Sequence, residues 1–169
     1  MNVPLRVVRF APEHASGVAA LIVPIQREEF GISITLADQP DLADIPGFYQ
    51  RGAGDFWVAI CDGAVVGSIA LLDIGNSQAA LRKMFVAPAY RGREYGTARR
   101  LLDELIAWSG SRGLRDVFLG TTAKFLAAHR FYEKNGFREI DRTALPPTFP
   151  FMKVDTKFYV RSLPGKATG

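Results

Sequence analysis

The stretch Tyr90-Arg91-Gly92-Arg93-Glu94-Tyr95-Gly96-Thr97 stands between a strand-like run and the most regular helical pattern of the chain. Glycines let backbone N–H groups converge on one point, and the N-terminus of a helix adds the positive end of its macrodipole. Arg91 and Arg93 contribute two further positive charges. This stretch therefore predicts an anion-binding loop that suits phosphate oxygens.

The glycine spacing of this loop excludes two common phosphate-binding motifs. A Walker loop needs a lysine after its last glycine, and none follows Gly96. A dinucleotide fingerprint needs paired glycines at its start, and only Gly92 stands there. Taken alone, the loop also fits an ordinary turn with solvated arginines, so its interpretation depends on the flanking sequence.

The residues before the loop predict strands, helical segments and tight turns. Strands are expected at residues 5–10, 56–61, 64–72 and 79–86, where apolar and β-branched residues gather. A helix that opens at residues 11–13 has its apolar positions at Val18, Leu21, Ile22 and Ile25, and a short helix is expected at 41–51. Turns at Asp62-Gly63 and Gly75-Asn76-Ser77 indicate antiparallel pairing of the strands around them.

The residues after the loop predict alternating helices and strands. A helix that ends near Gly110 has its apolar stripe at Ala98, Leu101, Leu102, Leu105 and Ile106. Thr121 or Thr122 is expected to cap a second helix that runs through Lys134. Strands are expected at 117–119, 137–140 and 152–160, the last with Met152, Val154, Phe158 and Val160 on one face. This order favours an α+β fold with a mixed sheet, built by residues 1–169 as a single domain.

The composition predicts a compact soluble domain with an anionic ligand. The 169 residues are 48% hydrophobic and 22% charged, and their mean hydropathy is +0.05. A total of 21 Lys and Arg against 17 Asp and Glu gives a net charge of +4. A basic nucleic-acid binder is the alternative that this charge raises, but no basic helix face is interleaved with aromatic residues. No nucleic-acid partner is expected.

Cysteine and histidine usage argues against disulfides and metal sites. Cys61 is the single cysteine, which fits a reducing compartment. His14 and His129 lie far apart, and no carboxylates show ligand spacing around them, so no metal is expected. No apolar run approaches the ~18 residues that span a bilayer, and the N-terminus lacks a leader pattern. We therefore expect a cytoplasmic protein with no membrane partner.

Three separated motifs occur together in this chain. Val86-Ala87-Pro88 ends a strand, Arg91-Gly92 with Gly96 opens a helix, and residues 131–137 read Phe-Tyr-Glu-Lys-Asn-Gly-Phe. With these motifs, residues 56–140 resemble the GNAT superfamily of acetyl-CoA-dependent N-acetyltransferases. The resemblance implies a mostly antiparallel sheet flanked by helices, whose strands splay at Phe85 and Val117 to admit the pantetheine arm.

The resemblance also implies which residues bind acetyl-CoA. Amides from Arg91 to Thr97 cradle the pyrophosphate, and Phe85 and Val86 line the pantetheine arm. The full expected set is Phe85, Val86, Arg91, Gly92, Arg93, Glu94, Tyr95, Gly96, Thr97, Phe125 and Ala128. Two positions depart from the family pattern. Glu94 replaces a usual glycine and is expected to turn outward toward Arg91 or Arg93, and Phe125 replaces a common asparagine.

For catalysis, the resemblance makes Tyr132 the acid that protonates the departing thiolate, with Phe85 or Val86 N–H as the oxyanion donor. A core aromatic is the alternative reading of Tyr132. The family's strand glutamate is absent, because that strand offers Arg82 and Lys83. Glu29 is the first candidate base. The further candidates are Glu28, Asp73, Asp155 and His129, each with a surface or structural alternative.

The expected function is transfer of an acetyl group to a primary amine by direct attack in a ternary complex. The acceptor is an amine-bearing small molecule or peptide, and its site is expected from residues 26–49 and 145–151. The aromatic candidates for its walls are Phe30, Tyr49, Phe149 and Phe151. The alternative is a catalytically inactive acyl-CoA-binding sensor or interaction module. Many members of the family form homodimers, so the resemblance leaves a homodimer open for this chain without deciding its oligomeric state.

Overall fold

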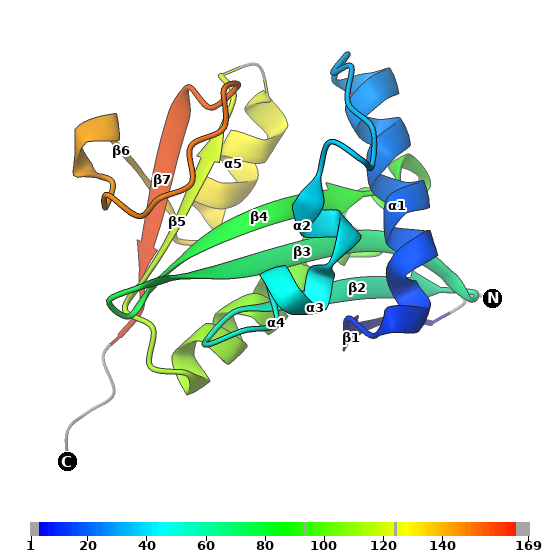
Figure 1. Cartoon of the computed structure of the whole chain (residues 1–169), viewed down its shortest axis with the longest axis horizontal. Coiled ribbons are helices and arrows are strands. Elements are labelled where there is room, and N and C mark those ends of the chain that lie inside the picture. The colour runs from blue at the N-terminus through cyan, green and yellow to red at the C-terminus, as the bar shows by residue number, and fades with distance from the viewer. Residues whose placement is uncertain (1–3, 93, 124, 165–169) are drawn as a thin grey trace.

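The computed structural model describes residues 4–92, 94–123 and 125–164, which form a seven-stranded sheet flanked by helices (Figure 1). The strand order is β1-β2-β3-β4-β5-β7-β6, and only β4 and β5 run parallel. The strands are β1 (Leu5–Arg9), β2 (Asp55–Cys61), β3 (Ala64–Gly75), β4 (Gln78–Val86), β5 (Asp116–Thr121), β6 (Arg138–Ile140) and β7 (Lys157–Ser162). The expected mixed, mostly antiparallel sheet is confirmed.

The two faces of the sheet are covered by different helices. Along β2, Trp57 packs with the helix α4 layer, whereas its neighbours Phe56 and Val58 pack with α1, because successive strand side chains point to opposite faces. The helices are α1 (Ala15–Pro24), α2 (Pro40–Ala43), α3 (Ile45–Phe48), α4 (Thr97–Ser111) and α5 (Leu126–Lys134). Short helical turns are η1 (Pro12–His14), the π-helical η2 (Ile25–Glu29), η3 (Pro88–Tyr90) and η4 (Arg142–Ala144).

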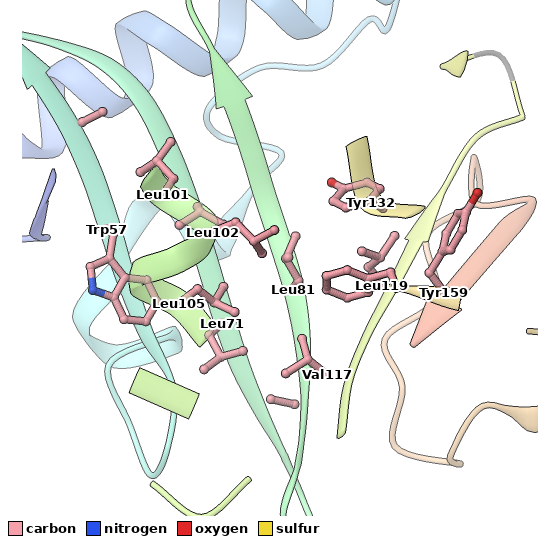
Figure 2. Packing of buried hydrophobic residues seen from close by; sticks show 14 of the residues in the cluster. Trp57, Leu71, Leu81, Leu101, Leu102, Leu105, Val117, Leu119, Tyr132 and Tyr159 are labelled. Atoms are coloured by element: carbon pink, nitrogen blue, oxygen red, sulfur yellow. The ribbon is translucent and has the colours of Figure 1, made fainter. Parts of the chain in front are cut away.

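The apolar stripe expected on α4 forms the centre of the larger core. Leu101, Leu102 and Leu105 are at most 1% exposed. They pack in one cluster with Trp57 and Leu71 from the sheet, as Figure 2 shows. Burying a leucine side chain stabilises a fold by about 1.5–3 kcal/mol, so this stripe fixes α4 against the sheet. The loop that precedes α4 is thereby held at the edge of the core.

The sequence predicted a single helix at residues 41–51. The structure instead has two short helices there, α2 and α3. Asp44 adopts non-helical angles (φ −143°, ψ 71°) between α2 and α3, which interrupts the helix. Its carboxylate instead accepts a hydrogen bond from Gly47 N at 3.0 Å and caps α3. The helical spacing of the apolar residues in this segment therefore reflects two short helices whose buried residues, Leu42 and Ile45, pack in the same cluster.

Two further expectations about boundaries are wrong. Thr121 belongs to β5, since it pairs with Lys157 of β7, and α5 begins after Phe125 without a side-chain cap. The strand expected at 152–160 is ordered as β7 only from Lys157. Met152 and Val154 precede it in a turn and are 42% and 50% exposed, so they do not share the buried face of Phe158 and Val160.

Candidate active site

The parallel strands β4 and β5 separate after three paired residues. Their register runs from Gln78 opposite Asp116 to Ala80 opposite Phe118 and then stops. Beyond Ala80, β4 continues beside β3 to Val86, while β5 continues beside β7 to Thr121. Figure 1 shows the two strands diverging as the arms of a V. The expected splay is present, and Phe85 lies on the diverging part of β4. Val117, the residue at which the splay was expected on β5, still pairs with Ala79, so β5 diverges only after Phe118.

The loop after β4 has the backbone expected of an anion-binding segment. Gly92 and Gly96 have φ values of +103° and +59°, a region that glycine occupies without strain. Gly96 is the N-cap of α4, so no side chain there covers the first amides of the helix. The Thr97 hydroxyl donates to Tyr90 O at 2.9 Å, which ties the start of α4 to η3. Apart from each glycine and its two chain neighbours, no described atom lies within 4 Å of a Cβ built on either glycine, so space is open beside both.

Arg91 is held in place by groups on two sides. Its Nε donates to Val86 O at 2.9 Å, and its Nη1 and Nη2 donate to the two carboxylate oxygens of Glu29 at 2.7 and 2.8 Å. This hydrogen bond is the main cause that lowers the pKa of Glu29. The structure therefore brings the candidate base Glu29 to the expected phosphate loop, where its pairing with Arg91 weakens it as a base.

Glu94 is exposed, as expected of an outward-turned side chain, but Arg91 pairs with Glu29 rather than with Glu94. The other partner expected for Glu94, Arg93, lies outside the described residues. Tyr95 is 38% exposed, and its ring centroid lies 5.0 Å from that of Tyr90. The loop therefore presents two adjacent aromatic rings beside its glycines.

Aromatic rings connect the two arms of the V. The ring of Phe30, at the end of η2, lies 4.3 Å from the ring of Phe125 and 6.2 Å from that of Phe85, measured between centroids. Phe85 is half-buried on the diverging part of β4, and Phe125 precedes α5. Phe85 and Phe125, which were both expected to contact acetyl-CoA, are thus linked by the ring of Phe30, which packs against both. Ala128 is half-buried on α5, one turn after Phe125.

Tyr132 lies on α5 between the diverging strands. Figure 2 shows its ring between β4 and β5, with the hydroxyl directed toward β4. The side chain is 7% exposed, and its ring packs edge-on against Phe131 and Phe137. Burial raises the pKa of this phenol. The phenol is therefore protonated at neutral pH and carries a proton that it could donate, although the raised pKa makes it a weaker acid than an ordinary tyrosine.

The remaining candidate bases have structural surroundings. Asp73 accepts hydrogen bonds from Ala53 N and Gly75 N at 2.9 and 2.8 Å. His129 is buried, with its Nε2 2.8 Å from Thr122 O, which agrees with a structural polar residue. Glu28 is exposed and lines a groove beside α1.

Asp155 differs from the other candidate bases because burial raises its pKa. Its carboxylate accepts from Met152 N at 3.1 Å. This bond ties together the turn that precedes β7.

A buried polar cluster under α2 escaped the sequence analysis. The Lys83 ammonium donates to Gln39 Oε1 at 2.7 Å and lies 3.5 Å from an Asp41 carboxylate oxygen. Gln39 and Gln26 exchange amide hydrogen bonds of 2.9 and 3.0 Å, and Tyr49 OH donates to Asp41 at 2.6 Å. The sequence signal for this cluster was the adjacent pair of cations, Arg82 and Lys83, in an apolar strand. The residues that contact Lys83 come from a distant, irregular segment of the chain.

The expected aromatic walls of the acceptor site are used in different ways. Tyr49 is fully buried and belongs to the core with Phe56, so its ring does not form a wall that a ligand can contact. Phe149 is also buried, against Phe158, whereas Phe151 is 45% exposed. The segment before β7 thus exposes Phe151 and buries Phe149.

Lys83 also marks an irregularity in β4. The register between β3 and β4 passes from Ser68 opposite Phe85 to Ala70 opposite Arg82, so β4 contains one extra residue. Lys83 takes a φ of +52°, and its carbonyl accepts from the Ser68 hydroxyl at 2.7 Å. Such a bulge turns backbone N–H groups away from the ladder, here at the point where β4 and β5 diverge.

The described part of the chain contains neither a membrane-spanning helix nor a cluster of metal-ligating side chains. Within residues 4–92, 94–123 and 125–164, no helix has both the length and the apolar character to cross a membrane. In the same residues, no three His, Cys, Asp or Glu side chains gather as metal ligands would.

Comparison with known proteins places this geometry in a family. Residues 52–139 match the family model of the acetyltransferase (GNAT) domain. A solved structure of a GNAT-family acetyltransferase from Staphylococcus aureus Mu50 superimposes with a TM-score of 0.89 at 37% identity, over 95% of this chain and 100% of that one. N-acetylglutamate synthase from Neisseria gonorrhoeae, solved with coenzyme A and N-acetyl-glutamate, shares the fold at 18% identity and a TM-score of 0.71, over 96% of this chain and 36% of that one.

Curated relatives of the chain include N-acetylaspartate synthetases. The protein of that name from Danio rerio is 38% identical over 105 residues, which are 61% of this chain and 36% of the relative. The chain spans 36% to 45% of the length of the five N-acetylaspartate synthetases that it matches.

Proposed function

Because this chain belongs to the GNAT acetyltransferase family, we propose that it transfers the acetyl group of acetyl-CoA to a primary amine of a small molecule or peptide. One observation carries the proposal. β4 and β5 diverge after Ala80, β4 leads into the glycine loop that heads α4, and the buried phenol of Tyr132 lies between the two strands in Figure 2. A nucleotide-bearing thioester fits this arrangement, with its phosphates at the loop and its acyl end near Tyr132.

Residues of the loop would hold the pyrophosphate. The first amides of α4 and the backbone around Gly92 and Gly96 offer N–H donors to anionic oxygens. Arg91 adds a guanidinium, provided that it exchanges Glu29 for phosphate oxygens. Phe85 and Val86 would line the pantetheine arm, with Phe125 and Ala128 opposite them.

The proposed reaction is direct attack in a ternary complex. The amine nitrogen bonds to the thioester carbonyl carbon, the C–S bond breaks, and coenzyme A leaves as a thiolate that takes a proton. The Tyr132 hydroxyl supplies this proton and is reprotonated by the proton that the attacking nitrogen loses as the amide forms. The N–H of Phe85 or Val86 stabilises the oxyanion. Glu29 accepts the proton of the ammonium substrate. It does so after its ion pair with Arg91 has opened, because the pKa of Glu29 then returns toward the ordinary value of a glutamate.

Calorimetric titration with acetyl-CoA, with ATP and NADH as anionic controls at two salt concentrations, tests the proposal first. Selective binding of acetyl-CoA supports the site, and release of coenzyme A with a panel of amines supports the enzyme. Equal binding of all three anions, with a steep salt dependence, would mean a non-specific anion site and would overturn the proposal.

A second candidate function is an acyl-CoA sensor without catalysis. The ion pair between Arg91 and Glu29 favours it, since it occupies the candidate base. Tight acetyl-CoA binding without release of coenzyme A for any amine in the panel would support the sensor over the enzyme.

A further inference from the structure

Arg82 stands on β4 where this strand leaves β5. It comes two residues after Ala80, the last residue of β4 that pairs with β5. It lies opposite Ala70 of β3, which packs in the cluster covered by α1, α2 and α3. Its side chain therefore belongs to the face of the sheet opposite α4, beside the opening of the V.

Two chain segments converge on this arginine: residues 26–49, which the sequence assigned to the acceptor side, and the turn at Met152, directly after the other assigned stretch, residues 145–151. The guanidinium carbon of Arg82 lies 5.8 Å from the ring centroid of Phe48 on α3 and 6.0 Å from that of Tyr49. From the other side, its Nη2 donates to the Met152 thioether at 3.4 Å, at an exposed position. Both segments lie in front of the sheet in Figure 1. A solute that approaches the V from this side meets the guanidinium between an aromatic face and an exposed turn.

The hydrogen-bonding capacity of Arg82 is largely unused. A guanidinium has five N–H donors, and a thioether is a weak acceptor. Among the described residues, no carboxylate lies within ion-pair distance of Arg82. Asp41 is committed to Lys83 and Tyr49, and Asp155 accepts from the backbone of Met152. The charge of Arg82 reaches Asp155, whose pKa it lowers against the effect of burial, but the two form no ion pair.

We propose that the acceptor is an amino acid with a free carboxylate, and that Arg82 is the specificity-determining residue that binds this carboxylate. The proposal rests on the function proposed above. A planar guanidinium binds a carboxylate through two parallel N–H···O bonds, which a polyamine or an amide cannot provide. Phe85, the proposed oxyanion donor, lies three residues along β4, and the bulge at Lys83 sets it and Arg82 opposite Ser68 and Ala70, two residues apart on β3. At a rise of about 3.3 Å per residue, the two positions are about 7 Å apart along the strand. An arginine side chain and a small amino acid together span this distance.

Steady-state kinetics of the full chain with acetyl-CoA test the assignment. L-aspartate, which carries two carboxylates, is compared with L-alaninamide and the diamine cadaverine, which carry none. We expect the wild type to prefer L-aspartate. We expect Arg82→Gln to raise the KM for L-aspartate about 10- to 100-fold while kcat changes less than the KM. Arg82→Lys should recover part of the loss, because a lysine keeps the charge but not the fork.

The control variant is Arg138→Gln, which removes an exposed arginine of β6 and should leave all three substrates unchanged. An unchanged KM for L-aspartate in Arg82→Gln overturns the proposal. An equal loss for L-aspartate and L-alaninamide also overturns it, since it would show that Arg82 only holds the turn at Met152.

Direct titration separates this proposal from the enzyme itself. L-aspartate is titrated calorimetrically into wild type and Arg82→Gln, without acetyl-CoA. Weaker binding to the variant supports the carboxylate site even if no acetyl transfer occurs, and equal or absent binding to both proteins overturns it. Acetyl-CoA titrations of the same two proteins should agree, because Arg82 is not placed at the phosphate loop. Failure of acetyl-CoA to bind the wild type would instead overturn the proposed function.

Discussion

Arg91 and Glu29, 62 residues apart in sequence, form a bidentate ion pair with N–O distances of 2.7 and 2.8 Å. The pair joins the loop before α4 to the end of η2, which continues α1. Both side chains are partly exposed, so the pair adds little to stability by itself. Its importance is positional, because it holds the candidate phosphate-binding arginine against the candidate base.

Glu29→Gln tests both partners of this pair. We expect turnover to fall by on the order of 10²-fold if Glu29 is the base. We expect acetyl-CoA affinity to stay equal or improve, since Arg91 becomes available to phosphate. Steady-state turnover and calorimetric titration measure the two effects. Glu104→Gln, a change of an exposed glutamate on α4, is the control, and unchanged turnover in Glu29→Gln would remove Glu29 from the mechanism.

Tyr132→Phe removes one oxygen atom from a buried site. We expect turnover to fall by on the order of 10²-fold with nearly unchanged acetyl-CoA affinity, because the ring and its packing remain. Steady-state turnover and calorimetric titration with acetyl-CoA measure these two effects. Phe131→Leu is a packing control on the adjacent residue. Turnover equal to that of the wild type would assign Tyr132 to the core alone.

Glu94→Gly restores the residue type usual in the family at this position of the loop. We expect acetyl-CoA affinity to be equal or better, because an exposed negative charge near the phosphates is lost. Glu94→Gln separates charge from backbone freedom, and it should behave in the same way. A large loss of affinity in both variants would show that the carboxylate organises the loop.

Lys83→Met tests the buried polar cluster through the pH dependence of stability. Burial lowers the pKa of Lys83, so the folded protein binds this proton less tightly than the unfolded chain. Between the lowered pKa and about 10.4, the unfolded state therefore holds more protons, and the Lys83 contribution to the free energy of unfolding rises with pH. We expect the stability difference between wild type and Lys83→Met to grow in favour of the wild type from pH 7 to 9.5.

Urea denaturation at several pH values measures this difference. Lys153→Met, which changes an exposed lysine, is the matched control. A difference that stays constant over this pH range would show that Lys83 keeps its proton in the folded protein throughout.

Leu105→Ala tests the anchoring of α4. Leu105 is fully buried, so the substitution should lower the free energy of unfolding by about 2–5 kcal/mol. Glu104→Ala, at the exposed neighbouring position, should change it by less than about 0.5 kcal/mol. Urea denaturation followed by circular dichroism compares the two. Similar values for both variants would contradict the packing role of the stripe.

Local sequence signals were sufficient for most of the elements. The period of Leu101, Leu102 and Leu105 marks α4, and the turn at Asp62 and Gly63 takes the positive φ values typical of such hairpins. Where the prediction was wrong, long-range contacts decided. Thr121 remained in β5 because β7 supplied a partner for it, and no local signal contains that pairing.

The sequence by itself determined the family motifs, the glycine loop before α4 and the order of strands and helices. These features depend on residues a few positions apart, whose spacing the chain displays directly. Only the tertiary structure decided that Arg91 meets Glu29, that Lys83 is buried with Gln39 and Asp41, and that Arg82 faces Phe48 and Met152. The physical reason is that the partner of a charged side chain depends on which distant segments the packed sheet brings beside it.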